Sequence, residues 1–144
     1  MKVALGSDHR GFKTKEEVKE FLKSRKIDFL DQGTFNQESC DYPDFGKKAV
    51  RLVADGNADF AILMCGSGIG MSIVANKFKG IRGALCINSK MAALAREHNN
   101  ANVLIIAANF TTQDVLKEIL ESWFVSKFQG GRHGQRIAKI AELE

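Results

Sequence analysis

The stretch of sequence that most constrains the fold reads FAILM at residues 60–64 and continues as CGSGIGMS at residues 65–72. The first part is continuously apolar rather than alternating, which is typical of a strand covered on both faces of a sheet. In the second part, glycines alternate with other residues and lead into a helical pattern. A buried strand, a glycine-rich turn and a helix together indicate one unit of a parallel α/β fold.

Four further apolar runs lie along the chain, and segments with helical spacing separate them. The predicted strands comprise residues 3–5, 29–30, 60–64, 84–87 and 103–108. The predicted helices comprise residues 12–24, 44–54, 69–77, 89–98 and 112–125, with a last one from about Gln135. This alternation predicts an α/β domain with a five-stranded parallel sheet and right-handed crossovers.

The composition narrows the class of protein. At 144 residues, with 44% hydrophobic and 26% charged residues, the chain suits one folded domain and argues against disorder. No apolar run is long enough to span a membrane, and the first residues lack the pattern of a signal peptide. The net charge of +4 is not concentrated in a long basic run, so neither nucleic acid nor membrane is an expected partner. We expect a cytoplasmic protein.

Polar residues that directly follow the predicted strands are the first candidates for chemistry, since ligands of parallel α/β sheets bind beyond the carboxyl ends of the strands. Asp8 and His9 follow the first strand. After the third strand, the glycine-rich turn would expose backbone N–H groups at a helix start, which suits a phosphate or an oxyanion. The turn has neither the spacing of a dinucleotide fingerprint nor the Gly-Lys-Ser/Thr of a Walker A loop, so nucleotide binding is disfavoured.

Cys65 stands between that strand and the turn. A thiol beside a helix start could have its pKa lowered from the free value of about 8.5, and a base near neutrality can both take and return a proton. The alternative is a small buried apolar side chain, which is what we expect of Cys40 and Cys86. Three cysteines without a C-x-x-C spacing do not form a disulfide framework or a zinc ribbon. The residues alone leave both interpretations of Cys65 open.

Two later segments carry candidate binding groups. His98 lies in the segment REHNNAN at residues 96–102, which either ends a helix through an asparagine or offers amides to sugar hydroxyls. Arg132 and Arg136 are four residues apart, so if the last helix includes both, they share one of its faces and could hold a single phosphate. The alternative for these arginines is a solvated basic tail.

Taken together, these segments closely resemble the ribose/galactose isomerase family, which includes the type B ribose-5-phosphate isomerases and the galactose-6-phosphate isomerases. The matching residues occur in family order at 6–9, 11–12, 41–43, 65–72, 75–77, 80–82, 95–99, 101–103 and 130–133. The resemblance implies a Rossmann-like three-layer α/β/α fold and isomerisation of an aldose phosphate to a ketose phosphate through an enediolate. It also implies a reaction without metal or organic cofactor, in a homodimer or a dimer of dimers with its sites at the subunit interface.

The resemblance also implies a role for each matching residue. Cys65 would move the proton between C1 and C2 of the sugar, because the position at which one branch of the family has a glutamate is Met71 here. The enediolate would be stabilised by the Ser67 hydroxyl and by the amides of Gly66, Gly68, Ile69 and Gly70. His98 would open the furanose ring with the help of Asp8. The sugar would be held by Asp41, Tyr42 and Asn99, and the phosphate by His9, Arg132 and Arg136.

Two departures from the family pattern concern the phosphate. Many relatives have an arginine after the fifth strand, where this chain has Asn109, and Lys90 is the nearest cation after the fourth strand. The intact segment GGRH at residues 130–133 favours ribose 5-phosphate as the substrate, with a six-carbon sugar phosphate as the first alternative. A non-catalytic module that binds a phosphorylated metabolite is the second, and it would have no need of Cys65, His98 and Asp8 together. The segment at about residues 130–144 is expected to pack on the partner subunit.

Overall fold

β3 (Phe60–Cys65) is the central strand of the sheet in the computed structural model, which describes residues 1–144. The other strands are β1 (Lys2–Ser7), β2 (Asp28–Asp31), β4 (Gly83–Leu85) and β5 (Val103–Ala107). They pair in the order β2-β1-β3-β5-β4, and every pair is parallel. The predicted five-stranded parallel sheet is therefore confirmed, including the short β2.

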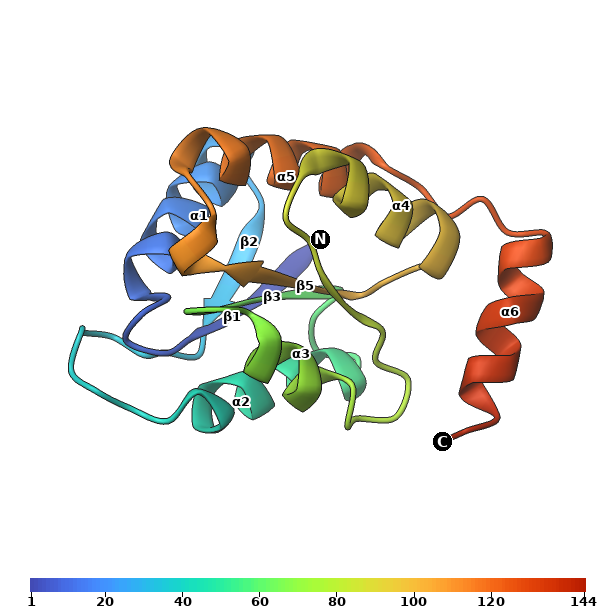
Figure 1. Ribbon diagram of the computed structural model, residues 1–144, viewed down its shortest axis with the longest axis horizontal. Helices are drawn as coiled ribbons and strands as arrows, with labels where there is room; N and C mark the ends of the chain where they lie inside the picture. Colours follow the sequence, from blue (N-terminus) through green and yellow to red (C-terminus); the bar gives the residue numbers. More distant parts are fainter.

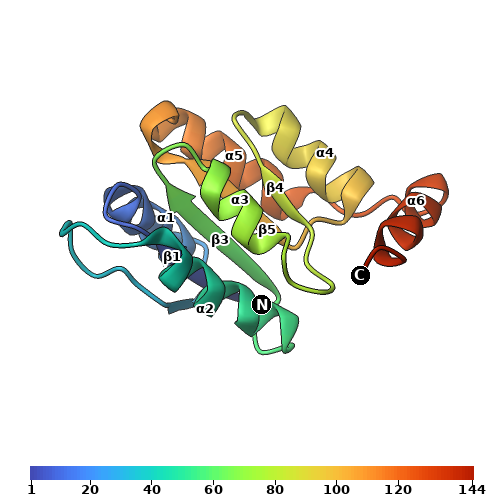
Figure 2. The ribbon, with the colours of Figure 1, turned by 60° about the horizontal axis from the view of Figure 1, so that its bottom comes forward.

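Helices cover both faces of this sheet, so the fold has three layers (Figure 1). The helices are α1 (Phe12–Ser24), α2 (Tyr42–Ala54), α3 (Ile69–Ala75), α4 (Ser89–Asn99), α5 (Gln113–Val125) and α6 (Arg132–Ala141), with a 3-10 turn at Ala108–Phe110. Figure 2 shows α2 and α3 together on one face, while α1, α4 and α5 cover the other. None of the helices has the length and apolar character that a membrane span needs. The helix α6 begins at Arg132, ahead of the predicted start near Gln135, so both Arg132 and Arg136 belong to it.

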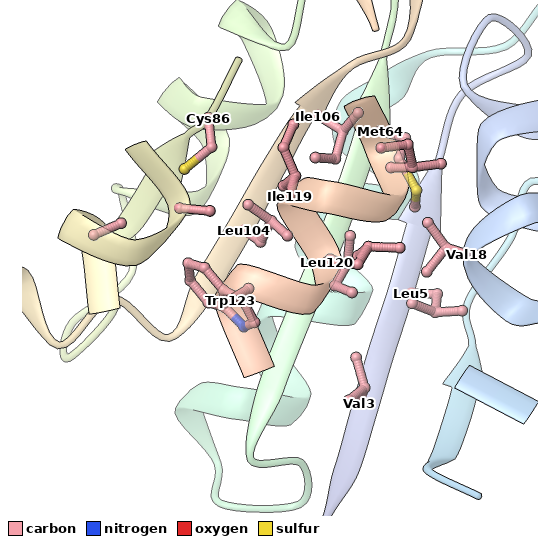
Figure 3. Packing of buried hydrophobic residues seen from close by; sticks show 14 of the residues in the cluster. Val3, Leu5, Val18, Met64, Cys86, Leu104, Ile106, Ile119, Leu120 and Trp123 are labelled. Carbon is pink, nitrogen blue, oxygen red and sulfur yellow. The ribbon is translucent and has the colours of Figure 1, made fainter. Parts of the chain in front are cut away.

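The core lies on both sides of the sheet because the central strands are apolar on both faces. On one side, the α5 residues Ile119, Leu120 and Trp123 pack with Val3 and Leu5 of β1 (Figure 3). On the other side, buried apolar residues of α2 and α3 pack against β3 and β5. All of β5 and most of β3 are buried, as their continuous apolar runs predicted.

The connections after the three inner strands diverge. The chain leaves β1 and β5 toward the face of α1 and α5, whereas it leaves β3 toward α3 on the opposite face. Strand register keeps the three ends level, since Ser7 pairs with Met64 and Cys65 pairs with Ala107. Loops that part in this way leave a crevice at the carboxyl ends of the strands.

The helix α6 stands apart from the three layers. It projects beyond the C-terminal end of α4 at one end of the molecule (Figure 1), and its main packing partner is α4. The approach to α6 is fixed by the Gln129 N–H, which donates to the Glu97 carbonyl at 3.0 Å. Its far end is fixed by Glu144, whose carboxylate accepts from the Gly80 N–H at 2.8 Å.

A buried ion pair ties α1 to β2 and to the loop that follows β2. The Lys15 ammonium is fully buried and lies 2.5 Å from Asp31 Oδ1. The same oxygen accepts from the Gly33 N–H at 2.9 Å. Burial alone would raise the pKa of Asp31, but the Lys15 ammonium and the Gly33 N–H outweigh it, so that this pKa is lowered. The pair therefore anchors the start of the loop that leads to α2.

Replacement of Lys15 by methionine tests this anchor. Lys15→Met leaves Asp31 without its buried partner, and we expect the free energy of unfolding to fall by about 3 kcal/mol in urea titrations. The matched variant Lys13→Met, at an exposed position of the same helix, should change it by less than about 0.5 kcal/mol. Lys15→Met/Asp31→Asn should recover part of the loss. Equal stabilities for the two single variants would contradict the account.

Candidate functional site

A cleft of about 630 Å³ opens where the loops after β1, β3 and β5 diverge. This volume lies within the range of small-molecule sites. The cleft is lined by Asp8, Arg10, Tyr42, Cys65, Gly66, Ser67, Ile69, Gly70, Ile73, Asn109 and Phe110. Seven of these eleven are among the predicted site residues, namely Asp8, Tyr42, Cys65, Gly66, Ser67, Ile69 and Gly70.

The Asp8 carboxylate is held by the turn between β1 and α1. Its Oδ1 accepts from the Arg10 N–H at 3.0 Å and from the Gly11 N–H at 2.9 Å. These bonds fix the side chain, which is 6% exposed and lines the cleft. Asp8 therefore presents a second, unbonded carboxylate oxygen from a rigid turn.

The glycine-rich turn forms the side of the cleft next to Cys65, whose side chain is 4% exposed. Gly68 has φ +73°, a left-handed conformation that favours glycine, and it lets the chain reverse into α3. The Ser67 hydroxyl accepts from the Ile69 N–H at 3.3 Å. The N–H groups of Gly66, Gly68 and Gly70 form no hydrogen bond within the chain. The turn thus offers donors beside a thiol.

Tyr42 reaches the cleft from the start of α2. It lies so close to Gly70 that a Cβ on Gly70 would collide with its ring. The absence of a side chain at Gly70 therefore permits α2 and α3 to approach at this point, where Tyr42 is part of the lining.

His9 and Asp41 lie near the cleft without lining it. His9 Nδ1 accepts from the Cys40 N–H at 3.2 Å, so any proton on a neutral His9 ring resides on Nε2. The Cys40 thiol is 3.9 Å from the same nitrogen and only partly buried, which differs from the packed position predicted for it. Asp41 is exposed at the N-cap position of α2.

The three cysteines are free and differ in their surroundings. Burial raises the pKa of Cys86 to about 12, and this side chain packs with α4 and α5, away from the cleft. Cys86 is therefore an inert packing residue, as predicted. No group of three or more His, Cys, Asp or Glu side chains lies close enough together to hold a metal ion.

The other predicted site residues lie together at the opposite end of the sheet, beside the amino ends of the strands. The helix α4 runs antiparallel to the strands that it connects, so His98 and Asn99 at its end lie far from the carboxyl ends of the strands. The His98 ring stacks on His133 of α6, with 4.1 Å between the ring centroids. Arg132 and Arg136 are exposed on α6, and neither forms an ion pair or a hydrogen bond. One chain alone does not bring these residues to Cys65.

Four residues of the cleft lie outside the predicted site: Arg10, Ile73, Asn109 and Phe110. The signal that could have found three of them is the rule that ligands bind beyond the strand ends, because Arg10 closely follows β1 and Asn109 and Phe110 follow β5. Ile73 carries no such signal, since its spacing on α3 is that of an ordinary apolar helix residue.

The stack of His98 on His133 predicts that the docking of α6 is sensitive to acid. Burial, the nearby His98 ring and the guanidinium groups of Arg132 and Arg136 lower the pKa of His133. Because the folded value is the lower one, the stability that neutral His133 contributes is fully present above the unfolded pKa of about 6.5. It is lost as the pH falls from there through the folded value.

We therefore expect the unfolding temperature to fall between about pH 7.5 and about pH 5.5. His133→Phe keeps a stacked ring that cannot be protonated, so its unfolding temperature should fall less over this range. Calorimetric scans of both proteins measure the difference. The same pH dependence in both would show that His133 does not carry the effect.

Comparisons with known proteins show which proteins the chain is similar to. A family model described as Ribose/Galactose Isomerase matches residues 3–140. Ribose-5-phosphate isomerase B of Escherichia coli is 40% identical over 143 residues, which cover 99% of this chain and 96% of that protein. The solved ribose-5-phosphate isomerase B of Clostridium thermocellum has a TM-score of 0.98 at 47% identity, covering 99% of this chain and 97% of that one. That of Mycoplasma genitalium, solved with bound ribulose 5-phosphate, has a TM-score of 0.94 at 38% identity, covering 99% and 95%.

Proposed function

The chain belongs to the ribose/galactose isomerase family, and we propose that it interconverts ribose 5-phosphate and ribulose 5-phosphate through an enediolate. The observation that carries this proposal is the cleft in which a buried cysteine, a serine hydroxyl and free backbone N–H groups line one wall. The relatives named ribose-5-phosphate isomerase B support a five-carbon substrate over a six-carbon one.

In the proposed reaction, the Cys65 thiolate removes the proton on C2 of the open-chain aldose. The electron pair of that C–H bond forms the C1–C2 double bond, and the carbonyl oxygen on C1 takes the negative charge. Return of the proton to C1, with transfer of the hydroxyl proton from O2 to O1, gives the ketose. The position of Cys65 at the end of β3, inside the cleft, supports this role.

The glycine-rich turn stabilises the enediolate in this proposal. Free N–H groups that are already oriented need no rearrangement when charge develops on the substrate oxygen. Those of Gly66, Gly68 and Gly70 meet this description, and the Ser67 hydroxyl can donate its proton while it accepts from the Ile69 N–H. Tyr42 and Asp41 would border the sugar from the start of α2.

A second copy of the chain completes the site in this proposal. His98 and Asn99 of the second copy would meet the sugar, and its Arg132 and Arg136 would meet the phosphate beside His9. Free, exposed guanidinium groups on a helix that projects from the body support this arrangement. So do the exposed apolar side chains at the rim of the cleft, Ile69 at 58%, Ile73 at 57% and Phe110 at 77%. The same surface would hold residues 130–144 of the partner, in a dimer or a dimer of dimers.

Ring opening precedes the proton transfer, since only the open-chain sugar has an aldehyde. We assign it to His98 of the second copy, with Asp8 accepting or returning the proton of the sugar hydroxyl. The unbonded oxygen of Asp8 inside the cleft supports its part. We place the reaction in the cytoplasm, because three free cysteines fit a reducing compartment.

An assay of ribose 5-phosphate isomerisation in the presence of EDTA tests the proposal. The wild-type protein should be active and insensitive to EDTA, and Cys65→Ala should lower kcat at least about 1000-fold with little change in substrate affinity. Loss of exchange between the C2 proton and solvent deuterium in Cys65→Ala would locate the defect in the proton-transfer step.

Cys86→Ala is the matched control, because it removes a buried thiol that lies outside the cleft. It should retain wild-type kcat. An active Cys65→Ala protein would overturn the role of the cysteine, and a wild-type protein with higher kcat/KM on galactose 6-phosphate or allose 6-phosphate would overturn the choice of substrate.

A further inference from the structure

Arg10 is the only cationic side chain that lines the cleft. It lies in the turn between β1 and α1, where its own N–H donates to Asp8 Oδ1 at 3.0 Å. That bond fixes the backbone from which the side chain starts. The guanidinium group forms no hydrogen bond and no ion pair within the chain, although most cations of α1 are paired with carboxylates.

The aliphatic stem of Arg10 lies against Gly66, directly after β3, and the Asn109 side chain from the turn after β5 lies against the same residue. A Cβ built on Gly66 would lie 3.0 Å from Arg10 Cδ and 2.9 Å from Asn109 Nδ2. Both groups therefore flank the same point of the cleft wall. The place of Asn109 is fixed by its own N–H, which donates to the Gly66 carbonyl at 3.0 Å. The stem that carries the Arg10 guanidinium and the Asn109 amide therefore flank one residue of the cleft wall, directly after the strand that ends in Cys65.

The charge balance of the cleft explains what these donors could bind. Asp8 is the only acid of the lining, and one of its oxygens already accepts two backbone N–H groups. Without Arg10, the part of the lining that this chain supplies would carry only negative charge, and every guanidinium at the phosphate would have to come from the second copy. A guanidinium is a planar fork of five donors that pairs with phosphate oxygens two at a time.

We infer that Arg10, assisted by the Asn109 side-chain amide, binds the phosphoryl group of the substrate inside the cleft of its own chain. This inference rests on the proposed function, since it names a binding residue of the same site. Arg10 acts in binding and not in proton transfer. Its loss should therefore raise KM and leave kcat nearly unchanged.

Arg10→Met tests the inference, because methionine keeps an unbranched stem over Gly66 and lacks the charge. We expect KM for ribose 5-phosphate to rise about 10- to 100-fold, the effect of one charge-assisted hydrogen-bonding pair, with kcat within about threefold of wild type. The inhibition constant of inorganic phosphate should rise by a similar factor. Turnover of unphosphorylated ribose should not change, and Arg10→Lys should recover part of the affinity.

Lys13→Met is the matched control, since Lys13 is an exposed cation on the first turn of α1, outside the cleft and without an ion pair. Its KM should equal that of wild type. The same KM in Arg10→Met would overturn the inference, as would an equal loss of kcat on ribose and on ribose 5-phosphate.

The shared position of Arg10 and Asn109 allows a rescue experiment. Because both groups lie beside the same point of the wall, Arg10→Met/Asn109→Arg returns a guanidinium to it from the other loop. The double variant should have a KM closer to wild type than Arg10→Met. A KM as high as that of the single variant would show that the cleft does not respond to charge at this point.

Calorimetric titration with inorganic phosphate separates this inference from the proposed function. If the wild-type protein fails to isomerise ribose 5-phosphate, the proposed function is wrong. Weaker phosphate binding by Arg10→Met than by Lys13→Met would then still support an anion site at Arg10, and equal binding by both would overturn it.

Discussion

The burial of β3 on both faces is the constraint on which the rest of the structure depends. A strand buried on both sides must have helices above and below it, so the chain leaves β3 for the face opposite to that of its neighbours β1 and β5. Parallel pairing keeps the three strand ends level. The cleft, its thiol and its free N–H groups all lie where these connections part.

The same topology explains why one chain forms only part of the proposed site. A helix that connects two parallel strands must return from their carboxyl ends to their amino ends. The helix α4 therefore carries His98 away from Cys65. The His98–His133 stack then holds α6, with its two arginines, at this opposite end of the sheet. A residue placed this way can act on the cleft only across a subunit boundary. The proposed dimer would in this sense be a consequence of the parallel fold.

Much of the fold could be predicted from local pattern, because continuous apolar runs and helical spacing report burial directly. The bounds of α1 and the strand β3 are examples. The sequence pattern predicts a later start for α6, because Gly130, Gly131 and Gly134 suggest a loop. In the structure, docking on α4 through His133 stabilises the helix from Arg132. Tertiary packing here outweighed the low helix propensity of glycine.

The site was predictable where a motif is continuous in sequence, as in the turn after Cys65. The position of Arg10 shortly after β1 makes it a candidate, but that position alone does not show that its side chain lines the cleft. An arginine in an exposed turn has an ordinary surface pattern, and its position in the cleft depends on the side-by-side arrangement of β1, β3 and β5. The separation of His98 from Cys65 likewise depends on the direction of α4. Neither relation is encoded in the spacing of residues along the chain.

Mixing two inactive variants tests most directly whether each site is built from two copies. Cys65→Ala lacks the proposed base, and Arg132→Ala/Arg136→Ala lacks the two exposed arginines of α6. In random pairing about half of the dimers are mixed and each has one intact site, so chains unfolded and refolded together should recover about a quarter of wild-type activity. Activity equal to the sum of the two separate variants would contradict a site shared between two chains.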